Sequence, residues 1–146
     1  MKQQLQFFID SWRLIPFPNI FPRDYNLLQF YSLPVRKAIC ITGFRRVGKT
    51  YLLFDLAQKL GKDNCIYLNF ENLQLPQKTA LLNSLTDLLS ETYGQKSMTL
   101  LLDEIQNIPK WSLWVRQMLD TTNHQIFLSG SSSKLTSDEI PTEMRG

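Results

Sequence analysis

The 146-residue sequence has few of the residues from which zinc sites and hydrolase triads are built. It contains two cysteines, Cys40 and Cys65, and a single histidine, His124. The cysteines lack the spacing of a metal site, and no histidine is placed to activate a serine. Both cysteines fall in strand-like apolar segments, so we expect buried thiols in a reducing cytoplasm.

Long apolar runs and strong charge are also lacking. No apolar run approaches the roughly 20 residues of a membrane span, and the N-terminus does not follow the signal-peptide pattern. The net charge of +3 is too small to indicate nucleic-acid binding by itself. Hydrophobic residues make up 43% and charged residues 20%, the composition of one ordinary globular domain. We therefore expect a cytoplasmic protein without membrane association.

Glycine is scarce, and two of the six glycines frame a phosphate-binding loop, G-x-x-x-x-G-K-T, the Walker A pattern, at residues 43–50. An apolar strand is expected before it and a helix after it, the context that this loop requires. Glycine lets backbone N–H groups approach phosphates, Lys49 reaches the β- and γ-phosphates, and the Thr50 hydroxyl ligates Mg²⁺. The predicted ATP-binding residues are Gly43, Phe44, Arg45, Arg46, Val47, Gly48, Lys49, Thr50 and Tyr51. For Arg45 and Arg46, a solvated position and a direct phosphate or partner contact both stay open.

A second motif completes the predicted site. Three leucines at 100–102 precede Asp103 and Glu104, the Walker B pattern of an apolar strand followed by two acids. Asp103 is predicted to hold Mg²⁺ opposite Thr50, and Glu104 to orient the water that attacks the γ-phosphate. The next apolar segment ends in serines, and Ser129 and Ser131 are candidate sensors of the γ-phosphate, with a plain serine-rich loop as the alternative.

The hydrophobic pattern alternates between strands and helices, which predicts right-handed β-α-β units and a parallel sheet. Ligands of such sheets bind at the carboxyl ends of the strands. We predict an N-terminal helical and extended segment over residues 1–34 and a nucleotide-binding core over 35–146. Asn107 is predicted to cap the last helix. The expected helices are 4–15, 25–33, 49–60, 77–92 and 107–120, and the expected strands are 37–42, 65–70, 98–102 and 125–128.

Over residues 23–146 the chain resembles AAA-type ATPases of bacteria and archaea that pair an AAA domain with a poorly characterised C-terminal domain. The resemblance implies an α/β fold, the three-layer P-loop NTPase sandwich of AAA/ASCE type, with the fourth strand between the phosphate-loop strand and the Asp103 strand. The motifs that carry it are Gly43–Thr50, Tyr67–Glu71, Leu102–Asn107, Trp111 with Trp114–Arg116, and Leu128–Ser132.

Members of the resembled family usually continue past the counterpart of Gly146. We therefore expect this chain to be the front part of a longer ATPase, truncated before the fifth strand and a helical lid. By position, Arg145 corresponds to a trans-acting arginine of AAA assemblies. Without a fifth strand, the phosphate-loop strand would be an open sheet edge unless the N-terminal segment covers it.

The predicted function is ATP binding and Mg²⁺-dependent hydrolysis, coupled to a partner or C-terminal effector domain outside this chain. ATP and ADP are the predicted ligands, a protein or nucleic acid the unidentified client, and homo-oligomerisation of a full-length protein stays open. The alternatives are a nucleotide-dependent interaction module with little hydrolysis and a small-molecule P-loop kinase. The adjacent Asp103 and Glu104 and the lack of an arginine-rich lid segment disfavour the kinase.

Overall fold

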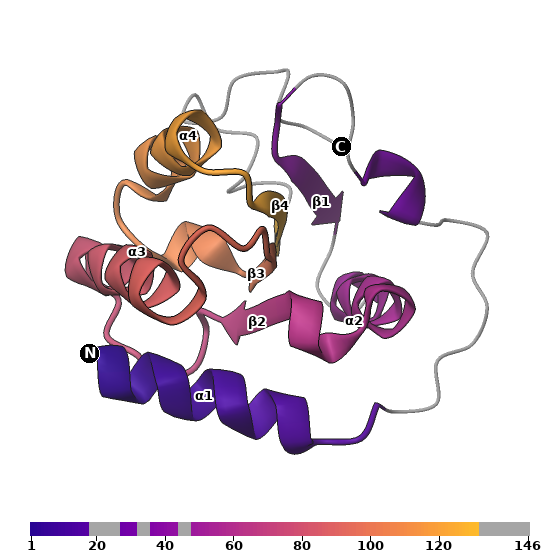
Figure 1. The fold of residues 1–146 in the computed structure, drawn as a ribbon, viewed down its shortest axis with the longest axis horizontal. Coiled ribbons are helices and arrows are strands. Elements are labelled where there is room, and N and C mark those ends of the chain that lie inside the picture. Colours follow the sequence, from indigo (N-terminus) through magenta and orange to yellow (C-terminus); the bar gives the residue numbers. More distant parts are fainter. Residues whose placement is uncertain (18–26, 32–35, 44–47, 132–146) are drawn as a thin grey trace.

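A four-stranded parallel sheet with helices on both faces forms the body of the protein (Figure 1). The computed structural model describes residues 1–17, 27–31, 36–43 and 48–131. The strands are β1 (Ile39–Gly43), β2 (Cys65–Asn69), β3 (Thr99–Asp103) and β4 (Gln125–Ser131). The helices are α1 (Lys2–Leu14), α2 (Lys49–Leu60), α3 (Thr79–Tyr93) and α4 (Trp111–Thr121), and the short 3₁₀ helices are η1 (Leu27–Phe30), η2 (Lys62–Asn64) and η3 (Ile105–Asn107).

The order of the strands is β1-β4-β3-β2. All pairs are parallel, so the carboxyl ends of the strands meet at one edge of the sheet. The register places Asp103 of β3 beside Ser129 of β4 and beside Asn69 of β2, while Ser131 lies beside Gly43. The α/β fold and the position of the fourth strand, next to the phosphate-loop strand, are thus confirmed.

Two hydrophobic cores lie on opposite faces of the sheet. Side chains alternate along each strand, so in β3 Leu100 and Leu102 pack toward α3 and α4, and Leu101 packs toward α2. All five residues of β3 are buried, because both of its faces are covered. Both cysteines are buried as predicted, Cys40 in β1 and Cys65 in β2, and no disulfide joins them. The longest described helix, α3, has 15 residues, and no helix in the described ranges is long and apolar enough to cross a membrane.

Helix α1 lies along the β2 edge of the sheet (Figure 1). Leu5 and Ile9 join the core beneath α3 and α4, whereas Trp12 joins the core beneath α2. The Arg13 guanidinium donates to the Cys65 carbonyl at 3.0 Å, which satisfies an acceptor of the edge strand. Within the described residues, α1 therefore covers β2 and not the phosphate-loop strand β1, which lies at the other end of the sheet.

The predicted start of the last helix was wrong. Asn107 ends η3, and its side-chain amide donates to the Glu104 carbonyl at 3.0 Å instead of capping α4. Pro109 disfavours helical backbone at the residue before it, and Ile108 is accordingly extended, with φ −103° and ψ 124°. Helix α4 therefore begins only at Trp111, after Lys110 in a left-handed conformation.

Most other boundaries differ from the prediction by one or two residues, and two elements differ more. Strand β4 continues to Ser131, three residues past the predicted end at 128, because Ser129 to Ser131 pair with β1. The short helix expected at 25–33 is the 3₁₀ helix η1 within the described residues. Residues 18–26 and 32–34 of the predicted N-terminal segment lie outside the described residues.

We expect Trp12→Ala to lower the free energy of unfolding by about 3–5 kcal/mol, because the indole is buried between α1 and the sheet. Leu14→Ala on the same helix is the control, since Leu14 is 85% exposed, and its effect should stay within about 0.5 kcal/mol. Urea denaturation followed by circular dichroism measures both. Equal effects of the two substitutions would contradict the assigned packing of α1.

Candidate functional site

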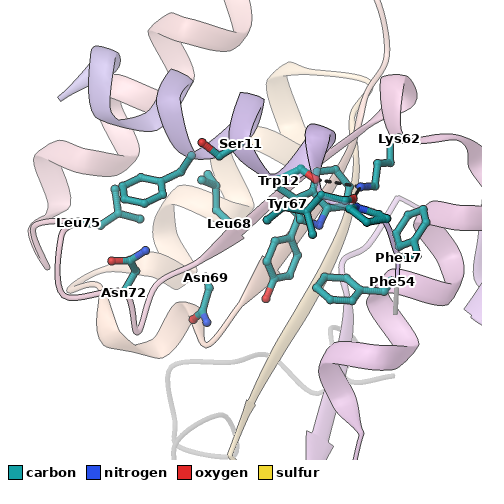
Figure 2. Close-up of a pocket in the computed structure, with 13 residues that line it drawn as sticks. Ser11, Trp12, Phe17, Phe54, Lys62, Tyr67, Leu68, Asn69, Asn72 and Leu75 are labelled. Atoms are coloured by element: carbon teal, nitrogen blue, oxygen red, sulfur yellow. Dashed lines mark hydrogen bonds between the residues drawn. The ribbon is translucent and has the colours of Figure 1, made fainter. Parts of the chain in front are cut away.

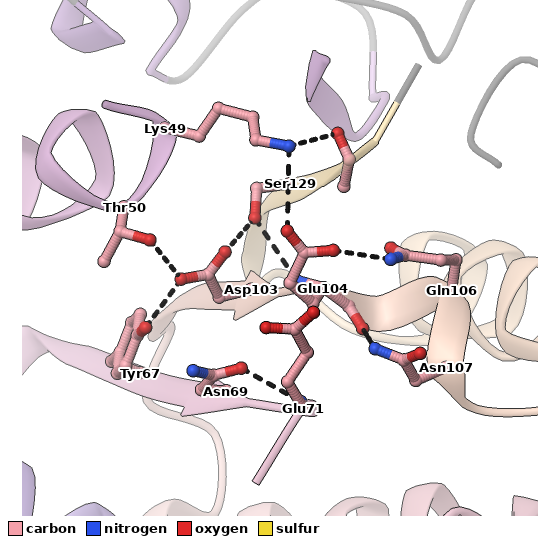
Figure 3. Close-up of polar contacts among 11 residues, drawn as sticks. Lys49, Thr50, Tyr67, Asn69, Glu71, Asp103, Glu104, Gln106, Asn107 and Ser129 are labelled. Carbon is pink, nitrogen blue, oxygen red and sulfur yellow. Dashed lines mark hydrogen bonds and ion pairs between the residues drawn. The ribbon is translucent and has the colours of Figure 1, made fainter. Parts of the chain in front are cut away.

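Polar side chains converge where β1, β3 and β4 end and α2 begins (Figure 3). Gly43 is the last residue of β1, and Gly48 leads into α2 with φ +88°, a conformation that favours glycine. Lys49 and Thr50 follow in the first helical turn. The predicted loop residues Phe44 to Val47 lie outside the described residues, so their contacts remain predictions. Tyr51 is described and is 44% exposed.

The Asp103 carboxylate is the centre of the cluster. It is only 2% exposed and accepts hydrogen bonds from three hydroxyl groups. Thr50 donates to Oδ2 at 2.7 Å, Tyr67 donates to the same oxygen at 2.6 Å, and Ser129 donates to Oδ1. Helix α2 and strands β2 and β4 are thereby joined to β3, and Thr50 lies beside Asp103. Their shared binding of Mg²⁺ stays a prediction.

Tyr67 belongs to the site although the sequence analysis did not include it. Burial, and then the neighbouring Asp103 carboxylate, raise the pKa of Tyr67, so its hydroxyl remains a protonated donor. A tyrosine in a buried strand needs a partner for its hydroxyl, and that need is the sequence signal that could have identified it.

The Tyr67 ring also lines an apolar cavity of about 310 Å³ beside α1 (Figure 2). It stacks on Trp12 with ring centroids 5.5 Å apart and meets Phe54 of α2 edge-on at 4.9 Å. The ring faces the cavity while the hydroxyl faces Asp103. Tyr67 thus connects the packing of α1 to the polar cluster.

Lys49 is 6% exposed and its ammonium lies within the cluster. It donates to the Gly130 carbonyl at 2.7 Å and lies 3.6 Å from Oε1 of Glu104. A buried ammonium needs such partners, because an unpaired buried charge is costly. An anion that enters the loop therefore has to compete with Glu104 and Gly130 for this side chain.

Glu104 is held on both its backbone and its side chain. Its backbone is left-handed, with φ +58°, which is uncommon for a residue other than glycine and is concentrated at functional sites. Its N–H lies 2.9 Å from the Ser129 carbonyl and 3.2 Å from the Ser129 hydroxyl. The side-chain amide of Gln106 donates to Oε2, opposite the Oε1 that faces Lys49. No role was predicted for Gln106 from the sequence.

The two sensor candidates differ in their surroundings. The Ser129 hydroxyl is engaged within the cluster, between Asp103 and the Glu104 N–H. The Ser131 hydroxyl is buried and has no hydrogen-bond partner among the described residues. Ser131 lies beside Gly43, at the start of the phosphate-loop motif. Arg145 falls outside the described residues.

The donors fit a magnesium site better than a zinc site. Thr50 and Asp103 offer hard oxygen atoms 2.7 Å apart. The described part of the chain has no group of three or more histidine, cysteine, aspartate or glutamate residues placed for a metal. Mg²⁺ commonly takes one or two protein oxygens and completes its shell with water and substrate phosphates, whereas zinc requires three or four protein ligands.

Comparisons with known proteins agree with the fold. The sequence model of a family described as an AAA domain matches residues 35–146. An uncharacterized protein of Methanocaldococcus jannaschii is 37% identical over 139 residues, covering 94% of this chain and 30% of the relative. An uncharacterized protein of Haemophilus influenzae is 32% identical over 128 residues, covering 83% of this chain and 31% of the relative. The chain spans less than a third of the length of these relatives.

We expect Tyr67→Phe to lower the free energy of unfolding by about 1–2 kcal/mol, because Asp103 loses a donor to its buried carboxylate. Tyr93→Phe is the matched control, since the Tyr93 hydroxyl is buried without a partner in the described part of the chain. Its removal should be close to neutral. Thermal and urea unfolding of both variants provide the measurement, and a neutral Tyr67→Phe would contradict the assigned hydrogen bond.

Proposed function

The chain belongs to the AAA domain family, and on this premise we propose that it binds ATP with Mg²⁺ at the carboxyl edge of the sheet and hydrolyses the γ-phosphate. Family membership supports nucleotide binding. One observation carries the proposal of hydrolysis: Thr50 and Asp103, 53 positions apart in sequence, are 2.7 Å apart, with Lys49 and Glu104 paired beside them. P-loop hydrolysis uses a lysine on the phosphates, a hydroxyl and an aspartate for Mg²⁺, and a residue that orients the water, and these four side chains supply such a set.

In this proposal, residues 43–51 bind the triphosphate. The backbone N–H groups at the start of α2 point toward the phosphates, and the helix dipole favours their negative charge. Lys49 exchanges Glu104 and Gly130 for oxygens of the β- and γ-phosphates. The ammonium therefore keeps anionic partners in both states, while its departure exposes Oε1 of Glu104 to the nucleotide.

Thr50 and Asp103 would hold Mg²⁺ in this site. The ion supplies neutralisation of the charge on the β- and γ-phosphates. The Asp103 carboxylate is already oriented by the Tyr67 and Ser129 hydroxyls, so it would need little rearrangement. This preorganisation favours metal binding, because the Asp103 side chain loses its conformational entropy when the protein folds and not when the ion binds.

Glu104 is the proposed group that orients and polarises the attacking water. Its Oε1 accepts a hydrogen bond from the water and takes that proton, later released to solvent, as the water oxygen bonds to the γ-phosphorus. The bond from that phosphorus to the β–γ bridging oxygen breaks, and the products are ADP and phosphate. The Ser131 hydroxyl, at the end of β4, is the proposed donor to the γ-phosphate.

The proposed output of hydrolysis is a conformational change transmitted to a protein or nucleic-acid client, or to an effector domain outside the matched region. The greater length of the relatives supports an additional domain in proteins of this kind. A nucleotide-dependent interaction module with little hydrolysis remains the second candidate, because the described cluster holds Glu104 against Lys49. The two candidates differ in phosphate release and not in nucleotide binding.

We expect Lys49→Met to weaken Mg-ATP binding by roughly 10- to 100-fold, since a charged hydrogen bond to phosphate contributes about 1.5–3 kcal/mol. Lys59→Met is the matched control, because it removes the same charge from the other end of α2. Titration with a fluorescent ATP analogue measures both affinities. Unchanged affinity in Lys49→Met would reject this loop as the nucleotide site.

We expect Glu104→Gln to bind Mg-ATP at least as tightly as the wild-type chain, because Lys49 loses an anionic competitor. Phosphate release should fall by roughly 10²- to 10⁴-fold, the usual contribution of a general base. Glu91→Gln is the control, since Glu91 is exposed and pairs with Lys2 on the surface. Single-turnover release of labelled phosphate is the measurement. If release required an added acceptor molecule, the kinase alternative would be supported instead.

A further inference from the structure

The geometry around Glu104 assigns a role to Gln106, a residue that the proposed mechanism does not use. The Gln106 amide lies within hydrogen-bond distance of Glu104 Oε2 (Figure 3). A carboxylate only accepts hydrogen bonds, so the amide presents its Nε2 donor to it. The other end of the amide, Oε1 of Gln106, then points away from the Glu104 carboxylate. This amide oxygen is buried without a partner in the described ranges.

Both residues are fixed by the backbone at the end of β3. Glu104 turns the chain in a left-handed conformation, and the following 3₁₀ helix η3 brings Gln106 back beside the carboxylate. Asn107 donates to the Glu104 carbonyl, and the Glu104 N–H is held by Ser129. The peptide groups on both sides of Glu104 are therefore restrained, and χ rotation of its side chain is the main freedom that remains.

We propose that Gln106 is a positioning residue that restrains this rotation and sets which oxygen of Glu104 meets the attacking water. The inference rests on the proposed ATP hydrolysis. Gln106 holds Oε2, and Lys49 holds Oε1. When Lys49 moves to the phosphates, Oε1 alone is released toward the nucleotide, and Oε2 stays bound to the amide.

Positioning of this kind affects rate more than binding. A misplacement of about 1 Å in a reacting group costs on the order of 100-fold in rate. The amide is not assigned a contact with ATP, so its loss should leave nucleotide affinity unchanged. Gln106 would act through Glu104, and its effect on the rate should therefore disappear when Glu104 is already disabled.

The test is a double-mutant cycle in the kcat and KM of steady-state phosphate release. Gln106→Met removes the amide at similar volume, and Gln106→Asn keeps an amide that is one methylene too short to reach. Gln117→Met, at an exposed position of α4, is the matched control. Each is measured in the wild-type chain, and both Gln106 variants are also measured together with Glu104→Gln. Mg-ATP affinity and melting temperature are recorded for every variant.

We expect Gln106→Met and Gln106→Asn to lower kcat by roughly 10- to 100-fold with KM within about twofold, and Gln117→Met to change neither. In the Glu104→Gln background, Gln106→Met should lower the residual rate by less than about twofold. Should one Gln106 variant fail to fold, the other provides the same comparison.

Two results would overturn this inference and leave the proposed hydrolysis intact. One is an unchanged kcat in both Gln106 variants. The other is an equal loss of kcat in the presence and absence of Glu104→Gln, which would indicate a general structural effect. A wild-type chain that binds Mg-ATP and releases no phosphate is a different result. It would contradict the proposed hydrolysis and remove the reaction that Gln106 is inferred to serve.

Discussion

The arrangement of the site depends on one buried carboxylate. Asp103 accepts hydroxyl hydrogen bonds from Thr50, Tyr67 and Ser129, which come from three different elements. A buried carboxylate without such donors would be costly, so the fold is stable in this form only when α2, β2 and β4 hold their positions around β3. The hydrogen bond from Thr50 to this carboxylate therefore also sets the position of the first turn of α2, where Lys49 and Thr50 lie.

A second interaction in the same cluster is the ion pair between Lys49 and Glu104. Lys49 and Glu104 neutralise one another at 3.6 Å, and Lys49 also binds the Gly130 carbonyl. A ligand that binds Lys49 must replace these contacts, and phosphate oxygens are strong acceptors that meet this requirement. The pairing keeps two buried charges compatible with folding. In the proposed function it links occupation of the loop to the release of Glu104, because both depend on the same ammonium group.

Local patterns were sufficient for most of the fold. Apolar runs identified the central residues of the four strands in the described part of the chain, because strand segments covered on both faces are mostly apolar. The failures came where backbone geometry outweighed local preference. Asn107 has the chemistry of a cap, but Pro109 keeps Ile108 extended, and η3 takes up the residues that were assigned to the helix. Tyr67 was overlooked because its aromatic ring suits a buried strand. The register pairs Tyr67 with Leu101, and only the placement of the side chain shows that its hydroxyl reaches Asp103.

The sequence by itself determined the class of the protein and the pairing of two motifs, because a glycine loop before a helix and two acids after an apolar strand are local features of the chain. The tertiary structure decided which partners those residues take. Contacts between Tyr67 and Asp103, between Ser129 and Asp103, and between Lys49 and Gly130 join residues 26 to 81 positions apart. These contacts follow from the order and register of the strands. Strand order and register depend on how the whole sheet assembles and cannot be read from the spacing of residues along the chain.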